Sequence, residues 1–481
     1  MCVDHNTKPY KVVCYLGSWA NYRHGPGLFL IEHIDPYVCT HLVYGFAKIA
    51  GNQIRAYDPY LDLKENWGLG TVLTASLYSH TRLGLQLVES LLCVGAFQRF
   101  NNLRKENPNL STLIAIGGWN EGSVKYSNMV SSKENRTIFV DSVLSFLEKY
   151  EFDGLDMDWE YPANRGGKPE DKENYILLLK ELQAAFAPQG YLLTAAVSAG
   201  QKTIDTAYNI SEVAKYLDFI NLMAYDFHGS WETIAGHNAP LYGKADDSDY
   251  MKILNVDYAI NYWLSHGAPA SKIIMGMGTY GRSFTLEDAN KNGLGEKVQG
   301  KGKSGPMTKE EGMLGYNEIC KFVKSDGWTR VWDNDYKAPY AYHGNQWVGY
   351  DDLPSIKIKL SLIPMLQTEY LKKKGLGGGM VWSLETDDFR GNCGDGKYPI
   401  ITEIMEGLNG RIVRPPTTPA PPTTQGPPTS PRPTFPTLPP GYKYPCTTEG
   451  AFPHPHDCTR YFRCMRNSNG DLFSFIERCP P

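Results

Sequence analysis

The sequence lacks a long hydrophobic run and a strong excess of charge of either sign. No run of about 18 apolar residues, the minimum for a membrane-spanning helix, occurs in the chain. The net charge of −4 over 481 residues predicts no basic surface for nucleic acid or for an anionic membrane. We therefore expect neither a nucleic-acid partner nor membrane association, and we expect a monomer.

The N-terminus also lacks the apolar core of a signal peptide. Either a signal peptide is missing from this sequence or its start is misassigned. Several features predict an oxidising, extracellular location: ten cysteines, a Thr/Pro-rich tract, and N-glycosylation sequons at Asn109, Asn135 and Asn209. We expect a secreted glycoprotein.

Residues 152–161 alternate acidic and apolar side chains, and the rest of the chain is organised around them. In a strand, successive side chains point to opposite faces, so Asp156, Asp158 and Glu160 share one face. At ~3.3 Å per residue, Asp156 and Glu160 lie roughly 13 Å apart. Because neighbouring carboxylates repel, the pKa of at least one should be raised, as a general acid requires.

Three alternatives to a general-acid site are less well supported. They are a solvated polar edge, a metal site and a Ser/His/Asp hydrolase. A solvated edge is disfavoured because the opposite face is apolar and the run continues into Trp-Glu-Tyr-Pro. A hard-cation site ranks second, but no phosphate-binding loop or His cluster lies nearby, so we expect no metal and no cofactor. A Ser/His/Asp hydrolase is poorly supported, since His228 and His237 are explained as hydrogen-bonded loop residues.

The spacing Asp153-x-x-Asp156-x-Asp158-x-Glu160 matches the signature of family-18 glycoside hydrolases, the chitinases and their relatives. The whole segment resembles that of secreted arthropod chitinases. The resemblance covers about residues 11–410 and resumes in the C-terminal tail.

Short apolar runs alternate with helical stretches, which predicts a parallel α/β fold. Eight such runs suggest a (β/α)8 TIM barrel, with its active site at the C-terminal ends of the strands. The expected strands are 11–16, 41–46, 112–116, 154–160, 192–198, 219–225, 273–277 and 379–382. We assign residues 1–410 to this catalytic domain. Residues 283–352 are too long for one crossover and resemble the small α+β insertion domain of many family-18 chitinases.

Two segments, residues 71–95 and 360–369, interrupt the family pattern and would join smoothly if removed. We hypothesise that both are unspliced or wrongly assigned coding segments, which sequencing of the transcript can test. The alternative is two additional surface helices.

The composition changes after the catalytic domain. Residues 411–441 are rich in Pro and Thr and predict an extended linker. Residues 442–481 resemble a peritrophin-type chitin-binding module, a disulfide-rich β domain, with four of its six cysteines. Such a small domain depends on its disulfides, so we expect this incomplete module to fold poorly. Family resemblance implies the pairs Cys14–Cys39, Cys320–Cys393 and Cys446–Cys464.

The same resemblance implies a role for each catalytic residue. Family-18 enzymes use the N-acetyl carbonyl oxygen of the substrate as the nucleophile, so they need no second nucleophilic carboxylate. Glu160 would be the general acid and later the base. Asp158 would hold the acetamide N–H, Asp156 would share a proton with Asp158, and Tyr225 would orient the acetamide carbonyl.

Further residues are expected to line the cleft. Trp382 would form the floor under the sugar, with Tyr44 and Phe46 beside it. Met223 and Asp226 belong to the Met-x-Tyr-Asp motif, and neighbouring subsites would involve Trp119, Trp231, Tyr280 and Arg282.

These expectations define a chitinase that hydrolyses β-1,4-linked N-acetylglucosamine in chitin or chito-oligosaccharides with retention. The main alternative is a chitinase-like lectin that binds such sugars without cutting them. That state usually accompanies loss of the acid, and Glu160 is present. A structural matrix protein would need many binding modules, and only one partial module is visible.

Overall fold

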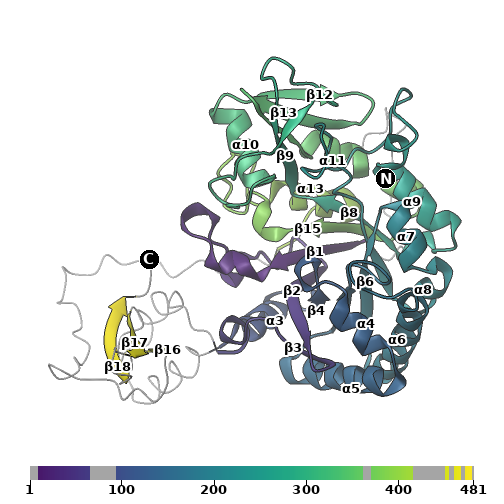
Figure 1. Cartoon of the computed structure of the whole chain (residues 1–481), viewed down its shortest axis with the longest axis vertical. Coiled ribbons are helices and arrows are strands. Elements are labelled where there is room, and N and C mark those ends of the chain that lie inside the picture. Colours follow the sequence, from purple (N-terminus) through teal and green to yellow (C-terminus); the bar gives the residue numbers. More distant parts are fainter. Residues whose placement is uncertain are drawn as a thin grey trace. The chain divides into compact units, whose positions relative to one another are not determined.

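The computed structural model describes residues 9–64, 94–360 and 370–414, together with the backbone of three strands between residues 450 and 478. Eight parallel strands close into a barrel, in which β1 completes the ring by pairing with both β15 and β2 (Figure 1). The barrel strands are β1 (Lys11–Gly17), β2 (His41–Ala50), β4 (Ser111–Gly117), β5 (Gly154–Asp158), β6 (Leu192–Ser198), β7 (Phe219–Met223), β8 (Ile273–Gly278) and β15 (Gly378–Trp382). The predicted eight-stranded barrel is confirmed.

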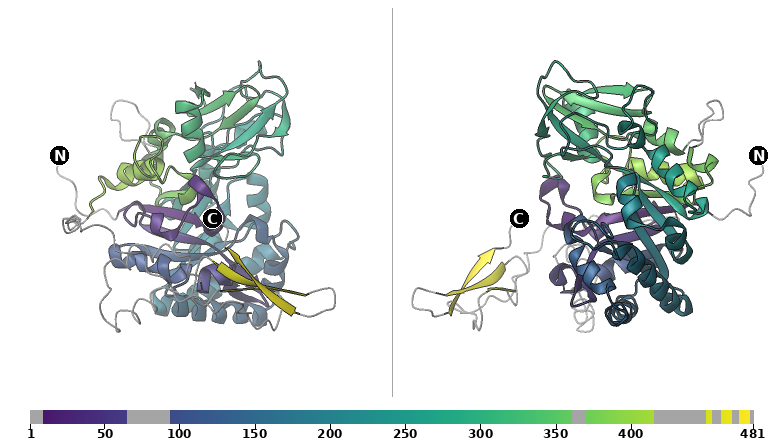
Figure 2. Two further views of the ribbon diagram at one scale, coloured as in Figure 1. Left: turned by 90° about the vertical axis from the view of Figure 1, so that its left-hand side faces the viewer. Right: turned by 45° about the vertical axis from the view of Figure 1, so that its right-hand side comes forward.

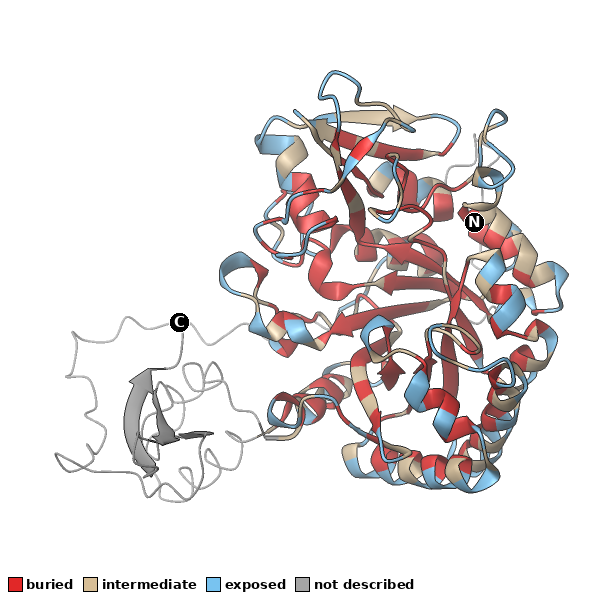
Figure 3. Ribbon diagram, viewed as in Figure 1, coloured by how far each residue is buried: buried red, intermediate tan, exposed pale blue. Residues whose placement is uncertain are grey.

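The barrel strands are apolar along nearly their whole length because both of their faces are covered. In β4, only the first of seven residues is not buried, and β8 is buried throughout. This continuous burial is typical of parallel sheets with helices outside and a packed interior. Figure 3 shows it as buried strands surrounded by helices whose outer faces are exposed.

Helices surround the barrel, and two of them begin with a side chain that caps the first turn. Ser132 accepts a hydrogen bond from the Asn135 backbone N–H at the start of α5, and Asn255 caps α9 in the same way. The helices of the barrel wall are α3 (Ala96–Glu106), α4 (Val124–Val130), α5 (Lys133–Tyr150), α6 (Asp171–Phe186), α7 (Gln201–Ala207), α8 (Ile210–Tyr216), α9 (Val256–Ser265), α11 (Leu353–Leu360), α12 (Tyr370–Lys373) and α13 (Pro399–Asn409).

A second, antiparallel sheet is inserted between β8 and α11. It has six strands, and α10 (Tyr316–Ser325) belongs to the same region. Its strands are β9 (Tyr280–Leu286), β10 (Val298–Lys301), β11 (Met313–Gly315), β12 (Thr329–Asp333), β13 (Ala338–His343) and β14 (Gln346–Gly349). The insertion strands gather on one side of the barrel in both turned views (Figure 2). The expected insertion, residues 283–352, lies within this region, but its first strand already starts at Tyr280.

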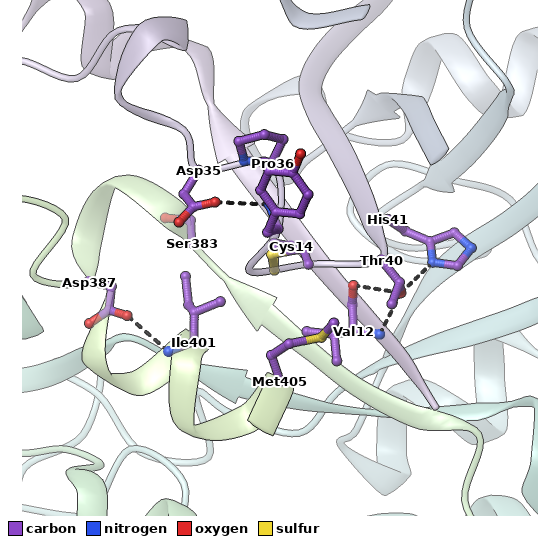
Figure 4. The surroundings of a disulfide bond; sticks show 12 residues. Val12, Cys14, Asp35, Pro36, Thr40, His41, Ser383, Asp387, Ile401 and Met405 are labelled. Carbon is purple, nitrogen blue, oxygen red and sulfur yellow. Dashed lines mark hydrogen bonds between the residues drawn. A yellow bond between two sulfur atoms is a disulfide. The ribbon is translucent and has the colours of Figure 1, made fainter. Parts of the chain in front are cut away.

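Two disulfide bonds predicted from the family resemblance are present. Cys14 of β1 pairs with Cys39, and Cys320 of α10 pairs with Cys393. Figure 4 shows the surroundings of the first bond, where the Thr40 hydroxyl donates to the Val12 carbonyl at 3.1 Å and accepts from the Val12 N–H at 2.8 Å. The Cys14–Cys39 disulfide and these hydrogen bonds therefore link the segment before β2 to β1.

Three further strands, β16 (Gly450–Pro453), β17 (Arg460–Arg466) and β18 (Leu472–Arg478), form a separate antiparallel sheet. Residues 71–93, 361–369 and 415–449 lie outside the described residues. They hold nearly all of the two atypical segments, most of the expected linker, and Cys446. Within the described part of the chain, no helix is both long and apolar enough to cross a membrane.

Candidate active site

The acidic row lies at the C-terminal end of β5. Asp156 and Asp158 are buried, and Glu160 follows the last residue of the strand by two positions. The apolar residues between them face the helices. For example, the Trp159 ring stacks on Tyr126 of α4 with 5.3 Å between centroids. The predicted alternation is therefore present at the end of the strand.

Gly117, the last residue of β4, makes room for the acidic row. Gly117 has a φ of 122°, and a Cβ there would lie 2.1 Å from the Asp158 carbonyl oxygen. The neighbouring Gly118 donates its backbone N–H to that oxygen at 2.9 Å. Glycine is needed at position 117 because any side chain would push β5 away.

Asp156 is held by hydrogen bonds from three other strands of the barrel. It accepts from the Tyr15 hydroxyl of β1 at 2.7 Å and from the Thr194 hydroxyl of β6 at 2.5 Å. Asn221 of β7 donates its amide to Asp156 at 3.1 Å and to the Tyr15 hydroxyl at 2.9 Å. Burial raises the pKa of Asp156, and these three hydrogen bonds oppose the rise. The network fixes the floor of the site.

The Asp158 carboxyl group has fewer hydrogen-bond partners than that of Asp156. Its buried Oδ1 has no hydrogen-bond partner among the described residues. Burial raises its pKa well above the usual range, and the negative charges of Glu160 and Asp156 raise it further. The site therefore offers a carboxyl group with one free acceptor oxygen beside Glu160.

Glu160 has a pKa suited to proton transfer near neutral pH. Burial is the main cause that raises its pKa to about 7, and the charge of Asp226 adds to the rise. A hydrogen bond from the Tyr161 side chain and the positive charge of Arg165 oppose it. Arg165 also donates Nη1–H to the Glu160 carbonyl oxygen at 2.9 Å. Both the protonated and the ionised form of Glu160 are therefore populated around pH 7.

Tyr225 and Asp226 follow β7 across the site. The Tyr225 side chain is buried and its hydroxyl lies 3.7 Å from Met380 Sδ of β15. Burial is the main cause that raises the pKa of Tyr225, so its hydroxyl stays a proton donor. Asp226 accepts hydrogen bonds from the Tyr280 hydroxyl at 2.7 Å and from Arg282 Nε and Nη2 at 2.6 Å each.

An aromatic cluster lies at the ends of β1, β2 and β15. The Trp382 ring lies 5.8 Å from Phe46, 5.6 Å from Tyr15 and 6.1 Å from Trp19, measured between centroids. Trp382 and Phe46 are half-buried, whereas Trp19 is exposed. The structure therefore brings two predicted residues together and adds Trp19, which the sequence did not single out.

Of the residues expected at neighbouring subsites, Trp119 and Trp231 are exposed, whereas Tyr280 is buried. Trp119 is 60% exposed, and the Arg165 guanidinium stacks on its ring at 3.6 Å. Trp231 is 62% exposed, and the Arg282 guanidinium lies 5.4 Å from its ring centroid. Met223 is half-buried at the end of β7.

Tyr44 does not fit the position expected for it. Its side chain is fully buried, its hydroxyl donates to Asp62 at 2.7 Å, and its ring packs edge-on against Phe97 and Phe100 of α3. Tyr44 therefore faces a covering helix rather than a surface that a sugar can reach. A register shift between β2 and β4 at Gly45–Ala47 breaks the alternation after Tyr44, so Phe46 does not share the face of Tyr44.

The partners of Asp156 were missed by sequence reasoning, although two of them carry a signal. Thr194 and Asn221 are polar residues in the middle of strands whose other interior positions are apolar. A buried polar side chain in such a strand must find a hydrogen-bond partner, so both could have been assigned to the interior of the site. Tyr15 carries no comparable signal because an aromatic residue fits any buried strand.

Metal-ligand geometry appears once among the described residues, at Cys320, Asp388 and Cys393. The two cysteines are joined in a disulfide, so neither offers a thiolate. Asp388 accepts backbone N–H groups from Asn392 and Cys393 at 3.0 and 2.7 Å. This group is therefore a structural cross-link and not a metal centre.

The two histidines considered for a Ser/His/Asp hydrolase are engaged in loop contacts. His237 Nε2 lies 3.0 and 2.9 Å from the carbonyl oxygens of Pro339 and Tyr350, and His228 Nδ1 lies 2.9 Å from Glu232. Both hold loops in place, as expected from the sequence.

Comparison with known proteins gives a consistent result. A family model described as "Glycosyl hydrolases family 18" matches residues 11–387. Mouse chitotriosidase-1 is 40% identical over 98% of this chain and 92% of its own length. The crystal structure of Ostrinia furnacalis Group IV chitinase is 40% identical, covers 83% of this chain and 99% of that chain, and has a TM-score of 0.72. Human YKL-39, described as a pseudo-chitinase with retained chitooligosaccharide binding, is 38% identical over 83% of this chain and 99% of that chain, with a TM-score of 0.70.

Proposed function

The chain belongs to glycosyl hydrolase family 18, and from this premise we propose that it is an active chitinase. It would hydrolyse β-1,4 linkages between N-acetylglucosamine units, with retention, in chitin and chito-oligosaccharides. The observation that carries this proposal is a carboxyl group with a pKa of about 7, Glu160, beside the buried Asp158 at the end of a barrel strand. We also propose a secreted, monomeric protein.

The first step would cleave the glycosidic bond. Glu160 donates its proton to the glycosidic oxygen, which leaves with the bonding electron pair. The acetamide carbonyl oxygen of the same sugar forms a bond to the anomeric carbon and gives a cyclic oxazolinium ion. Asp158 would accept the acetamide N–H through its unpartnered Oδ1 and offset the positive charge.

The second step would release the product. The Glu160 carboxylate takes a proton from water, whose oxygen attacks the anomeric carbon and opens the oxazolinium ring. Two inversions at one carbon give net retention. Because one group must lose and regain a proton in each cycle, a pKa near neutrality suits both steps.

Two further residues would position these groups. The Tyr225 hydroxyl, kept protonated by its raised pKa, would donate to the acetamide carbonyl. Asp156 would share a proton with Asp158, since two close buried carboxylates resist simultaneous ionisation.

The aromatic cluster would receive the sugar. Trp382 and Phe46 are half-buried, so each keeps an accessible part for a pyranose ring. Trp19 and Trp119 would extend this surface along the chain. Tyr44 is left out of the proposed cleft because it is fully buried. The strands β16 to β18 would belong to a chitin-binding module.

The alternative function is a chitinase-like lectin. The similarity to YKL-39, a protein described as a pseudo-chitinase, supports the view that this fold is compatible with binding alone. The presence of Glu160 favours the enzyme.

The test compares turnover of a fluorogenic chitobioside by the wild type and by Glu160→Gln. Loss of a general acid should lower kcat by about 10²- to 10⁴-fold, with the thermal midpoint retained. Equal, negligible rates from both proteins, with chito-oligosaccharide binding intact, would support the lectin instead.

A further inference from the structure

A concave site lies on the outer wall of the barrel along α9. It has a volume of about 550 Å³ and lies between α9 and the loop 242–252 that follows β7. Because α9 returns from the C-terminal end of β7 to the start of β8, its first turn lies at the same end of the barrel as Glu160. Figure 1 shows α9 beside α7 on this wall. We call this site the α9 groove.

The charged residues at the α9 groove are paired. Lys244 Nζ lies 2.6 Å from Asp333, and Lys374 Nζ lies 3.3 Å from Asp257. Lys252 lies 4.0 Å from Asp249. Each cation therefore has a carboxylate partner, and the groove has no excess charge to attract an anion. A neutral ligand fits this balance.

Two tyrosines of α9 supply a fixed aromatic surface. The rings of Tyr258 and Tyr262 lie 5.9 Å apart between centroids, and their planes differ by 23°. Both hydroxyls are tied to α7, from Tyr258 to Gln201 at 2.7 Å and from Tyr262 to Asp205. A ligand would therefore meet rings that are already held in place, so it loses little side-chain freedom on binding.

Asn261 adds a polar group between the tyrosines and the loop. Its Oδ1 accepts from Lys374 Nζ at 2.6 Å, which fixes the orientation of its amide. No acceptor for its Nδ2 is found within the described residues. That N–H2 group can donate to a ligand hydroxyl or carbonyl. Paired aromatic rings, an oriented amide and no net charge match the chemistry of a neutral sugar.

We propose that the α9 groove is an accessory polysaccharide-binding site that holds a neutral N-acetylglucosamine chain outside the active site. The identity of this sugar rests on the proposed function. A polymer bound along α9 stays next to the end of the barrel that carries Glu160. The groove would therefore matter for insoluble chitin and not for a short soluble substrate.

The experiment uses the full chain with Tyr258→Ala/Tyr262→Ala, which removes both rings. The matched control, Tyr258→Phe/Tyr262→Phe, keeps the rings and removes the hydroxyl contacts with α7. We measure the binding constant for insoluble chitin, hydrolysis of insoluble chitin, and kcat/KM for a fluorogenic chitobioside. The alanine pair should bind insoluble chitin about threefold to tenfold more weakly, with kcat/KM for chitobioside unchanged. The phenylalanine pair should lose less binding than the alanine pair, because it keeps both rings.

A third variant guards against a folding defect in the alanine pair. Ser265 is exposed at the edge of the groove, so Ser265→Arg narrows the groove without removing a buried side chain. It should also weaken binding to insoluble chitin. Wild-type chitin binding by both the alanine pair and Ser265→Arg would overturn the proposal, as would equal losses in the alanine and phenylalanine pairs. A wild type that binds chitin but turns over no chitobioside would instead contradict the proposed enzyme and leave the groove assignment standing.

Discussion

The floor and the rim of the acidic site differ in how their side chains are held. At the floor, Asp156 is fully buried and accepts hydrogen bonds from three strands. At the rim, Glu160 is bound by its neighbours Tyr161 and Arg165, and Trp119 beside them is exposed. In the proposed mechanism the floor would fix the geometry, whereas the rim would carry the proton and contact the substrate. Of Asp156 and Glu160, the group that would exchange its proton is the one with fewer hydrogen bonds to its side chain.

After loss of Glu160, the largest effect on activity is expected from Asp156→Asn, which alters the hydrogen bonds at the floor of the site. Loss of a charge-assisted hydrogen bond costs about 1.5–3 kcal/mol, so kcat/KM should fall about 10- to 150-fold. Burial is the main cause that raises the pKa of Asp158, and the variant removes one of the two negative charges that raise it further. The basic limb of the pH–rate profile should therefore shift. Chitobioside turnover measured from pH 4 to pH 9 checks this, and an unmoved basic limb would refute the coupling of the carboxyl groups.

A smaller effect is expected at the rim from Arg165→Gln. Glu160 must be protonated to act as the acid, so kcat/KM should decrease as pH rises through about 7. The positive charge of Arg165 lowers the pKa of Glu160, so removing that charge should move the basic limb to higher pH.

The matched control for this shift is Lys168→Gln, which removes a positive charge from the same loop. Its basic limb should stay at the wild-type position. Equal shifts in the two variants would mean that net charge, rather than the contact of Arg165 with Glu160, controls the pKa.

The smallest effect is expected from Trp119→Ala, which removes an exposed ring from the rim. Loss of one aromatic contact should raise KM for a long chito-oligosaccharide by about two- to tenfold and leave kcat nearly unchanged. Tyr44→Phe is the comparison, since Tyr44 faces α3 and should leave KM unchanged. Steady-state kinetics on chitohexaose distinguish the two. A raised KM in Tyr44→Phe would mean that Tyr44 does line the cleft.

The features predicted correctly from the sequence depend on local patterns. The eight strands follow from short apolar runs, and the family is confirmed by the match over residues 11–387. The acidic row needs only the two-residue period of a strand. The Cys14–Cys39 and Cys320–Cys393 bonds came from family resemblance and are present.

The features that were missed depend on contacts between distant parts of the chain. Tyr15 and Asp156 are 141 residues apart, and no local pattern shows that their side chains meet. The opposite placements of Tyr44 and Phe46 depend on a register shift with β4, which a period-two pattern cannot contain. Sequence alone therefore indicated which strand ends carry the site, but not which side chains at those ends face inward.

The first strand of the inserted sheet is also a brace for the catalytic end of the barrel. Tyr280 and Arg282 lie on β9, and together they donate three hydrogen bonds to Asp226, the residue after Tyr225. The inserted region therefore cannot be exchanged without regard to its contacts with the barrel. A chimaera that takes this region from a relative would have to inherit a compatible Tyr-x-Arg pair, or the loop bearing Tyr225 would lose its anchor.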